Sequence, residues 1–312
     1  HGAYFRDFVI DHGTEGCNYL LGVDVDMNTV DGYAITSWDR GYGDMEFVLD
    51  LDTIRRLSHL PSTAMVQCDL VWPDHAPVVQ SPRSILKAQQ QRAADLGYDA
   101  VAGTELEFIV FEDTYEAAHQ ANYSGLTPAN QYNVDYSILG TTRVEPLLRD
   151  IRNHMYAAGM DVEGAKGECN FGQHEIGFLY AEAMVTADNH AVYKNCAKEI
   201  AAQRGQAITF MAKYDEREGS SCHIHFSLQD EDGRSLFAED DAMFAFHDIN
   251  PLAPYHVLVI PKGAYVSWDD FSREAISMHM DMPGSSATSG VFAEGDVHIF
   301  HNQNHFLKYF YP

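Results

Sequence analysis

A run of apolar, β-branched and aromatic residues at 103–111 carries two glutamates. Such a short run predicts a buried β-strand. Glu105 and Glu107 are two residues apart, so their side chains point to the same face of that strand. Neighbouring carboxylates repel each other, and more so when buried, so a bound cation such as Mg²⁺ or Mn²⁺ is the usual remedy. An edge strand with both glutamates in solvent is the alternative.

Two later stretches repeat this kind of pairing. Glu168 and Glu175 enclose a segment with Gly and Gln, and His223 and His225 stand two apart in the strand-like run 220–228. Alone, the glutamates could be loop charges and the histidines a surface pair. Three acid or imidazole pairs in one chain favour a metal site.

The order of these motifs resembles the glutamine synthetase family. E-L-E-F comes first, then two glutamates ending in G-Q-x-E, then H-x-H-x-S-L, and the resemblance covers roughly residues 15–240. It implies an α+β fold, with a small N-terminal β-grasp-like part and a catalytic domain whose curved antiparallel sheet is flanked by helices. We therefore expect an N-terminal domain at 1–75, a catalytic domain at 76–245 and an unassigned tail at 246–312.

The same resemblance assigns roles to residues of the motifs. It implies that divalent metal is bound by Glu105, Glu107, Glu168, Glu175 and His223. His225 would meet phosphates, Ser227 the nucleotide, and Gly219 the glutamate substrate. Glu218 stands where the family has an asparagine, so this loop departs from the family pattern next to Gly219.

An Asp-Gly turn near the N-terminus provides the candidate catalytic acid. By resemblance, Asp31 binds and deprotonates the incoming amine, whereas a turn aspartate is the alternative. Tyr33 and Ala34 replace two serines of the family. A larger and less polar pocket is what an organic amine needs, so the chain resembles the γ-glutamyl-amine ligase branch, with ethanolamine or a polyamine as acceptor.

The activity that the resemblance implies is ATP-dependent ligation. Glutamate and ammonia or an organic amine would form a γ-glutamyl amide through γ-glutamyl phosphate, with ATP and Mg²⁺ or Mn²⁺. The family's active sites lie between subunits of stacked rings, so a large homo-oligomer is expected, with Asp31 supplied by the neighbouring subunit. A catalytically inactive relative that binds metal or ligand is the alternative.

The family pattern stops at about residue 245. The expected N-R-x-x-x-x-R segment and a final Glu-x-Arg strand are not found. Residues 246–262 instead resemble the opening strands of histidine-triad nucleotide hydrolases. Their H-x-H-x-H motif is absent, and the nearest segment is 296–301, so phosphoester hydrolysis is disfavoured. An irregular histidine-rich tail is favoured over a metal cluster of His298, His301 and His305.

Net charge and cysteine content limit the binding partners and the cellular location that we expect. The formal net charge of −26 argues against nucleic acid or an anionic membrane surface as a partner. The five cysteines are odd in number and lack CxxC spacing, which favours a reduced, cytoplasmic location. The sequence shows neither a long apolar run nor a signal peptide.

Local patterns predict the remaining elements. Turn and capping residues predict a helix from Pro82 to before Gly97, with Ile85 and Leu96 among its inward positions. Other helices are predicted at 146–158 and 188–204, strands at 18–25, 63–72, 160–165 and 206–213, a loop at 115–142, and a hairpin from 227 to 237 around Asp232-Gly233.

Overall fold

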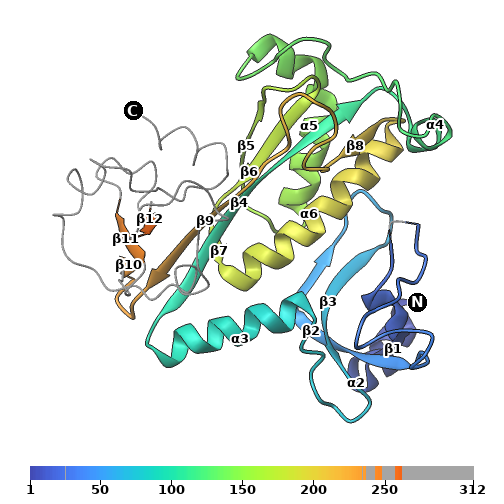
Figure 1. The fold of residues 1–312 in the computed structure, drawn as a ribbon, viewed down its shortest axis with the longest axis vertical. Coiled ribbons are helices and arrows are strands. Elements are labelled where there is room, and N and C mark those ends of the chain that lie inside the picture. Colours follow the sequence, from blue (N-terminus) through green and yellow to red (C-terminus); the bar gives the residue numbers. More distant parts are fainter. Residues whose placement is uncertain (25, 234, 237–242, 248–256, 262–312) are drawn as a thin grey trace. The chain divides into compact units, whose positions relative to one another are not determined.

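The computed structural model describes residues 1–24, 26–233, 235–236, 243–247 and 257–261. The chain divides into two compact units, 1–91 and 92–312. Figure 1 shows the elements of both units. Within the described residues, no helix has the length and apolar character needed to cross a bilayer.

The first unit contains a three-stranded antiparallel sheet in the order β1-β2-β3. The strands are β1 (Thr14–Cys17), β2 (Asp44–Arg56) and β3 (Ala64–Val71), and three short helical segments precede them: α1 (Gly2–Tyr4), η1 (Phe5–Val9) and α2 (Ile10–His12). Strand β3 confirms the strand predicted at 63–72. Strand β2 was not predicted, because acidic residues interrupt its apolar positions.

An ion-pair network ties the start of α3 (Pro82–Asp95) to this sheet. The Arg83 guanidinium donates to Asp50 of β2 at 2.5 Å and to Asp69 of β3 at 2.7 Å. Lys87, one turn further along the helix, also pairs with Asp69. One planar guanidinium therefore bridges two neighbouring strands.

The strand predicted at 18–25 is wrong. The structure has a 3-10 helix there, η2 (Asn18–Leu21), followed by a turn. The carboxylate of Asp24 accepts the backbone N–H groups of Asp26 and Asn28, both at 2.9 Å. Such local side-chain acceptors compete with strand pairing and favour a turn.

The inward stripe predicted for α3 is also wrong, although the helix itself is confirmed. No residue of α3 is buried, and Ile85 and Leu96 are 50% and 71% exposed. The polar run 89–91 separates the few apolar positions, so the helix has no continuous apolar face.

The second unit is built on β4 (Asp99–Phe111), which confirms the strand predicted at 103–111. It lies in a seven-stranded sheet ordered β10-β9-β4-β6-β5, and β7 and β8 also pair with β4, all antiparallel. The other strands are β5 (Val162–Gly167), β6 (Gln173–Phe178), β7 (Ala181–Glu182), β8 (Ala207–Thr209), β9 (Cys222–Gln229) and β10 (Ser235–Leu236).

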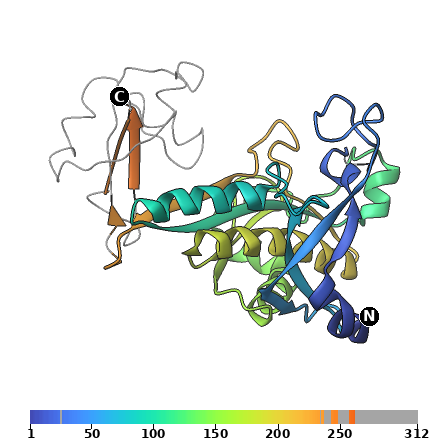
Figure 2. The same cartoon turned by 90° about the horizontal axis from the view of Figure 1, so that it is seen from below.

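Two long helices, α5 (Ile138–Ala157) and α6 (Ala183–Gln203), cover one face of this sheet, as Figures 1 and 2 show. The even-numbered residues of β4 face the helices. Thr104 lies 3.1 Å from His190 of α6, and Phe108 packs on Phe210, which contacts Tyr193 of α6. The odd-numbered residues of β4, including both glutamates, therefore point to the opposite face.

The predicted helix starts are wrong by several residues, because capping side chains lie further upstream. Ser137 caps α5 by accepting the N–H of Gly140 at 3.1 Å, so Pro146 lies inside the helix rather than at its start. Glu182 caps α6 by accepting two backbone N–H groups, the nearer from Met184 at 3.0 Å. The predicted loop 115–142 also contains α4 (Tyr115–Gln120) and the start of α5.

The hairpin predicted around Asp232-Gly233 is confirmed, because Ser235 pairs with Gln229 and Leu236 with Leu228. Beyond it, β11 (Met243–His247) and β12 (Val257–Pro261) form an antiparallel pair. Most of the predicted tail 246–312, including 296–301 and the histidines His298, His301 and His305, lies outside the described residues.

Candidate metal and substrate site

Strand register brings the predicted acids and one imidazole into a row across the sheet. Glu105 of β4 lies directly opposite His223 of β9, and Glu107 lies opposite Glu175 of β6. Glu175 in turn lies opposite Lys166 of β5. Residues directly opposite each other in antiparallel strands share a face, so this row lies on the face away from α5 and α6.

Glu105 lies between two histidines. Its Oε2 is 3.1 Å from Nδ1 of His223, and its Oε1 is 3.2 Å from Nε2 of His225. These contacts hold the pKa of Glu105 well below its usual range. Burial is the largest single influence on the pKa of His223, and it lowers that pKa. The hydrogen bond to Glu105 and the negative charges of the nearby glutamates together outweigh burial, so the net shift is upward.

Glu107 is buried, and hydrogen bonds fix its position. Its Oε2 accepts from Nε2 of Gln173 and from the backbone N–H of Ser221, both at 2.8 Å. Its own backbone N–H donates to the carbonyl of Ser221 at 3.0 Å. The side chain is therefore held in place with its second oxygen outside these two bonds.

Glu175 and Glu168 share Lys166 as a counterion. The Lys166 ammonium lies 3.1 Å from Oε1 of Glu175 and 3.4 Å from Oε1 of Glu168. Burial and then the charge of Glu107 raise the pKa of Glu168 to about 7, even with the lysine nearby. Burial likewise raises the pKa of Glu175. The row thus carries more negative charge than its own cation neutralises.

The donor set fits a divalent cation. Two groups of three residues each offer ligand atoms within 4.8 Å of one another, and they share Glu175: Glu105, Glu175 and His223, and Glu107, Glu168 and Glu175. Oε2 of Glu175 is buried without a hydrogen-bond partner, which is costly unless a cation binds there. Carboxylate oxygens with one imidazole suit Mg²⁺ or Mn²⁺.

The other predicted residues of this unit lie around the row. Ser227 and His225 follow His223 at two-residue steps on β9, and Ser227 is buried. The carbonyl of Gly219 accepts from Nε2 of Gln173 at 2.8 Å, which places the predicted glutamate loop next to the row. Asp31 is exposed in a turn of the first unit, and its role remains a prediction.

Sequence reasoning missed three members of this site: Lys166, Gln173 and Ser221. Lys166 comes directly after the strand predicted at 160–165. It stands two residues before Glu168, the same spacing that separates Glu105 from Glu107 and His223 from His225. Gln173 was noted only as part of a motif. The backbone N–H of Ser221 carries no sequence signal, because every residue except proline has that donor.

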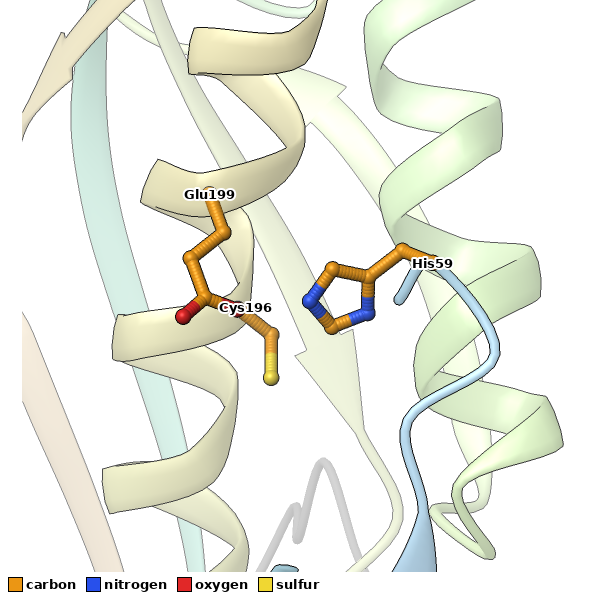
Figure 3. Close-up of side chains that lie close together, drawn as sticks. All are labelled: His59, Cys196 and Glu199. Atoms are coloured by element: carbon orange, nitrogen blue, oxygen red, sulfur yellow. The ribbon is translucent and has the colours of Figure 1, made fainter. Parts of the chain in front are cut away.

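The cysteines lie outside this row. All five are free. Cys169 donates its thiol to Asp135 at 3.3 Å, and burial raises its pKa to about 11. Cys196 and Glu199 lie within one turn of each other on α6 (Figure 3).

Comparison with known proteins identifies the class of fold and then the family. Residues 79–249 match the glutamine synthetase catalytic domain, and residues 229–301 match the HIT domain. The chain belongs to the glutamine synthetase family. The predicted resemblances to glutamine synthetase and to histidine-triad proteins are thus both confirmed. Members of the glutamine synthetase family generally use ATP and divalent metal ions.

Two curated relatives are glutamate–amine enzymes. Gamma-glutamylethanolamide synthetase GlnA4 of Streptomyces coelicolor is 66% identical over 77% of this chain and 52% of its own length. Glutamate–isopropylamine ligase of a Pseudomonas species is 34% identical over 79% of this chain and 54% of its own. The chain therefore spans about half the length of the curated relatives it matches.

Solved structures show the same fold. Apo GmaS without ligand superposes with a TM-score of 0.62 at 26% identity, covering 76% of this chain and 52% of that one. A GmaS/ADP complex gives 0.63 at 24%, covering 76% and 51%, and supports the fold alone. The predicted α+β fold with a glutamine-synthetase-type antiparallel sheet is confirmed.

Proposed function

We propose that this chain carries the metal- and glutamate-binding part of an ATP-dependent ligase that joins an amine to the γ-carboxylate of glutamate. The observation that carries this proposal is the row of buried and half-buried acids with one imidazole on one sheet face, where one oxygen of Glu175 lacks a hydrogen-bond partner. Membership of the glutamine synthetase family and the names of the two relatives support it.

The chemistry requires an activated carboxylate. An amine cannot displace oxide from a carboxylate at neutral pH, so the γ-carboxylate of glutamate first takes the γ-phosphoryl group of ATP and ADP is released. The amine nitrogen then attacks the carbonyl carbon of γ-glutamyl phosphate, phosphate leaves, and the amine gives up a proton. We assign that proton to Asp31 of a neighbouring subunit in a large homo-oligomer.

The residues of the row would perform the binding. Mg²⁺ or Mn²⁺ would be held by Glu105, Glu107, Glu168, Glu175 and His223. When bound, the ion supplies positive charge beside the transferring phosphoryl group. His225 and Ser227 continue the same face of β9 and would contact the phosphates and the nucleotide. The loop at Gly219 would contact glutamate.

The substrate amine is proposed to be organic, with ethanolamine or a polyamine as the class. Tyr33 and Ala34 support this proposal, because they stand where the family has two serines and would make the amine pocket larger and less polar. The names of the two relatives support it, since one is a gamma-glutamylethanolamide synthetase and the other a glutamate–isopropylamine ligase.

A second candidate is a metal- and ligand-binding protein without turnover. The observation that favours it is that the family match ends at residue 249, before the arginine segment expected from the resemblance. The two candidates share the metal site and differ in turnover.

ADP release separates them. The whole chain is incubated with ATP, Mg²⁺, glutamate and ethanolamine. The ligase account predicts ADP release that requires both glutamate and amine. Glu107→Ala should lower it at least about 100-fold because a metal ligand is lost, while Glu116→Ala, an exposed position on α4, should not change it. Metal binding without amine-dependent ADP release would favour the second candidate.

A further inference from the structure

Gln173 lies where two parts of the proposed site meet. It is 1% exposed, begins β6 and shares a sheet face with Glu175, two residues later. Its Nε2 donates to Oε2 of Glu107 at 2.8 Å and to the carbonyl of Gly219 at 2.8 Å. One amide nitrogen therefore contacts both a proposed metal ligand and the proposed glutamate loop.

The orientation of this amide is fixed by its surroundings. Oε1 of Gln173 accepts the backbone N–H of Asn170 at 2.8 Å. A flipped amide would place its oxygen against two acceptors, Glu107 and Gly219, and its nitrogen against a donor. Only one orientation of the amide satisfies all three contacts. Any other orientation would leave buried polar groups without partners, which destabilises the fold.

The segment 212–220, which contains Gly219, is closed by a backbone hydrogen bond and is also bonded to Asn170. Ser220 donates its backbone N–H to the carbonyl of Ala212 at 2.9 Å, which closes the segment 212–220. Asn170 also holds this loop, since its Nδ2 donates to the carbonyl of Glu218 at 2.8 Å and to Asp215 at 3.0 Å. A shift of the loop therefore acts on Gln173, and through it on Glu107.

We propose that Gln173 is a positioning residue that couples glutamate binding at the 212–220 loop to cation binding at Glu107. The proposal rests on the proposed function, in which the loop contacts glutamate and Glu107 binds metal. Glutamate that orders the loop fixes the Gly219 carbonyl, and this fixes the amide that holds Glu107. By thermodynamic linkage, each ligand then tightens the other by the same factor.

The test is a Mn²⁺ titration of the whole chain by calorimetry, with and without saturating glutamate. In the wild type, glutamate should tighten Mn²⁺ binding at least about fivefold. In Gln173→Met this factor should fall to about 1, although both ligands still bind. Gln173→Glu, the second variant, keeps the shape of the side chain and replaces the donating NH2 group by an acceptor oxygen. Asn130→Ala removes another buried amide, bonded to the Gly140 carbonyl, and should keep the factor.

The outcomes separate the two proposals. Coupling that survives in both Gln173 variants, or a wild type that binds both ligands without coupling, overturns the role of Gln173 and leaves the proposed function standing. A wild type that binds neither Mn²⁺ nor glutamate overturns the proposed function itself. Coupling lost in the Gln173 variants and kept in Asn130→Ala supports the inference.

Discussion

Glu107 and Glu175 lie directly opposite each other on β4 and β6, and they are only 6% and 3% exposed. Two buried carboxylates in such a position destabilise the fold unless positive charge compensates them. Lys166 supplies one positive charge to Glu175, and hydrogen bonds stabilise Glu107. The unpartnered Oε2 of Glu175 shows where compensation is incomplete, and this is the physical basis for a cation site.

Replacement of His223 should weaken metal binding without unfolding the chain. His223→Asn removes the imidazole opposite Glu105, and we expect Mn²⁺ affinity to fall about 10- to 100-fold, as measured by calorimetry. His174→Asn is the matched control, because His174 is a buried histidine on β6 whose side chain points to the helix face. It should lower thermal stability and leave Mn²⁺ affinity unchanged. Equal loss in both variants would contradict the assignment of His223.

The ion pairs at Asp69 should make the first unit sensitive to acid. Burial raises the pKa of Asp69, but the hydrogen bonds and charges of Lys87 and Arg83 outweigh it, so the pKa in the folded state lies below the usual value of an aspartate. The pairs therefore contribute stability that is fully present above about pH 4 and is lost as the pH falls through the lower folded pKa. Partial exposure limits this contribution to about 1–2 kcal/mol.

Urea unfolding, followed by tryptophan fluorescence between pH 7 and pH 3, checks this expectation. Asp69→Asn should lower the stability of the first unit at pH 7 and have less effect at pH 3. Asp11→Asn, at an exposed position, is the control and should follow the wild type at every pH. An equal loss at both pH values for Asp69→Asn would show that the charge is not the cause.

Gly172 should be intolerant of a side chain. Its φ is +70°, and a Cβ there would meet the carbonyl oxygen of Val110 at 2.6 Å. Gly172→Ala should therefore destabilise the second unit by more than the roughly 1 kcal/mol expected from backbone strain alone. Gly159→Ala tests the strain alone, because Gly159 has φ +87° and open space around it. Thermal unfolding of both variants gives the comparison, and equal losses would contradict the steric argument.

The sequence allowed same-face pairs to be predicted, because side-chain alternation in a strand is a local property. Glu105 with Glu107 and His223 with His225 follow from a spacing of two residues. What could not be predicted is which pair stands opposite which, because register depends on strand pairing between segments far apart in the chain. The contact between Glu105 and His223 joins residues 118 positions apart.

The predicted helix and strand boundaries were wrong where side chains make local hydrogen bonds that sequence patterns do not reveal. Ser137 and Glu182 cap their helices several residues before the predicted starts, and Asp24 closes a turn where a strand was predicted. The role of Gln173 depends on three partners from different segments, and only the folded chain brings them together.

Direct binding of Mn²⁺ to the whole chain tests the central claim most directly. The three proteins to titrate by calorimetry are the wild type, Glu175→Gln and the exposed control Glu116→Gln. All three should bind Mn²⁺ saturably, and only Glu175→Gln should bind it at least about tenfold more weakly. The reason is that Glu175 belongs to both groups of candidate ligands, and the variant loses its charge. No saturable binding to the wild type, or equal affinity in all three proteins, would contradict the metal site and the ligase account built on it.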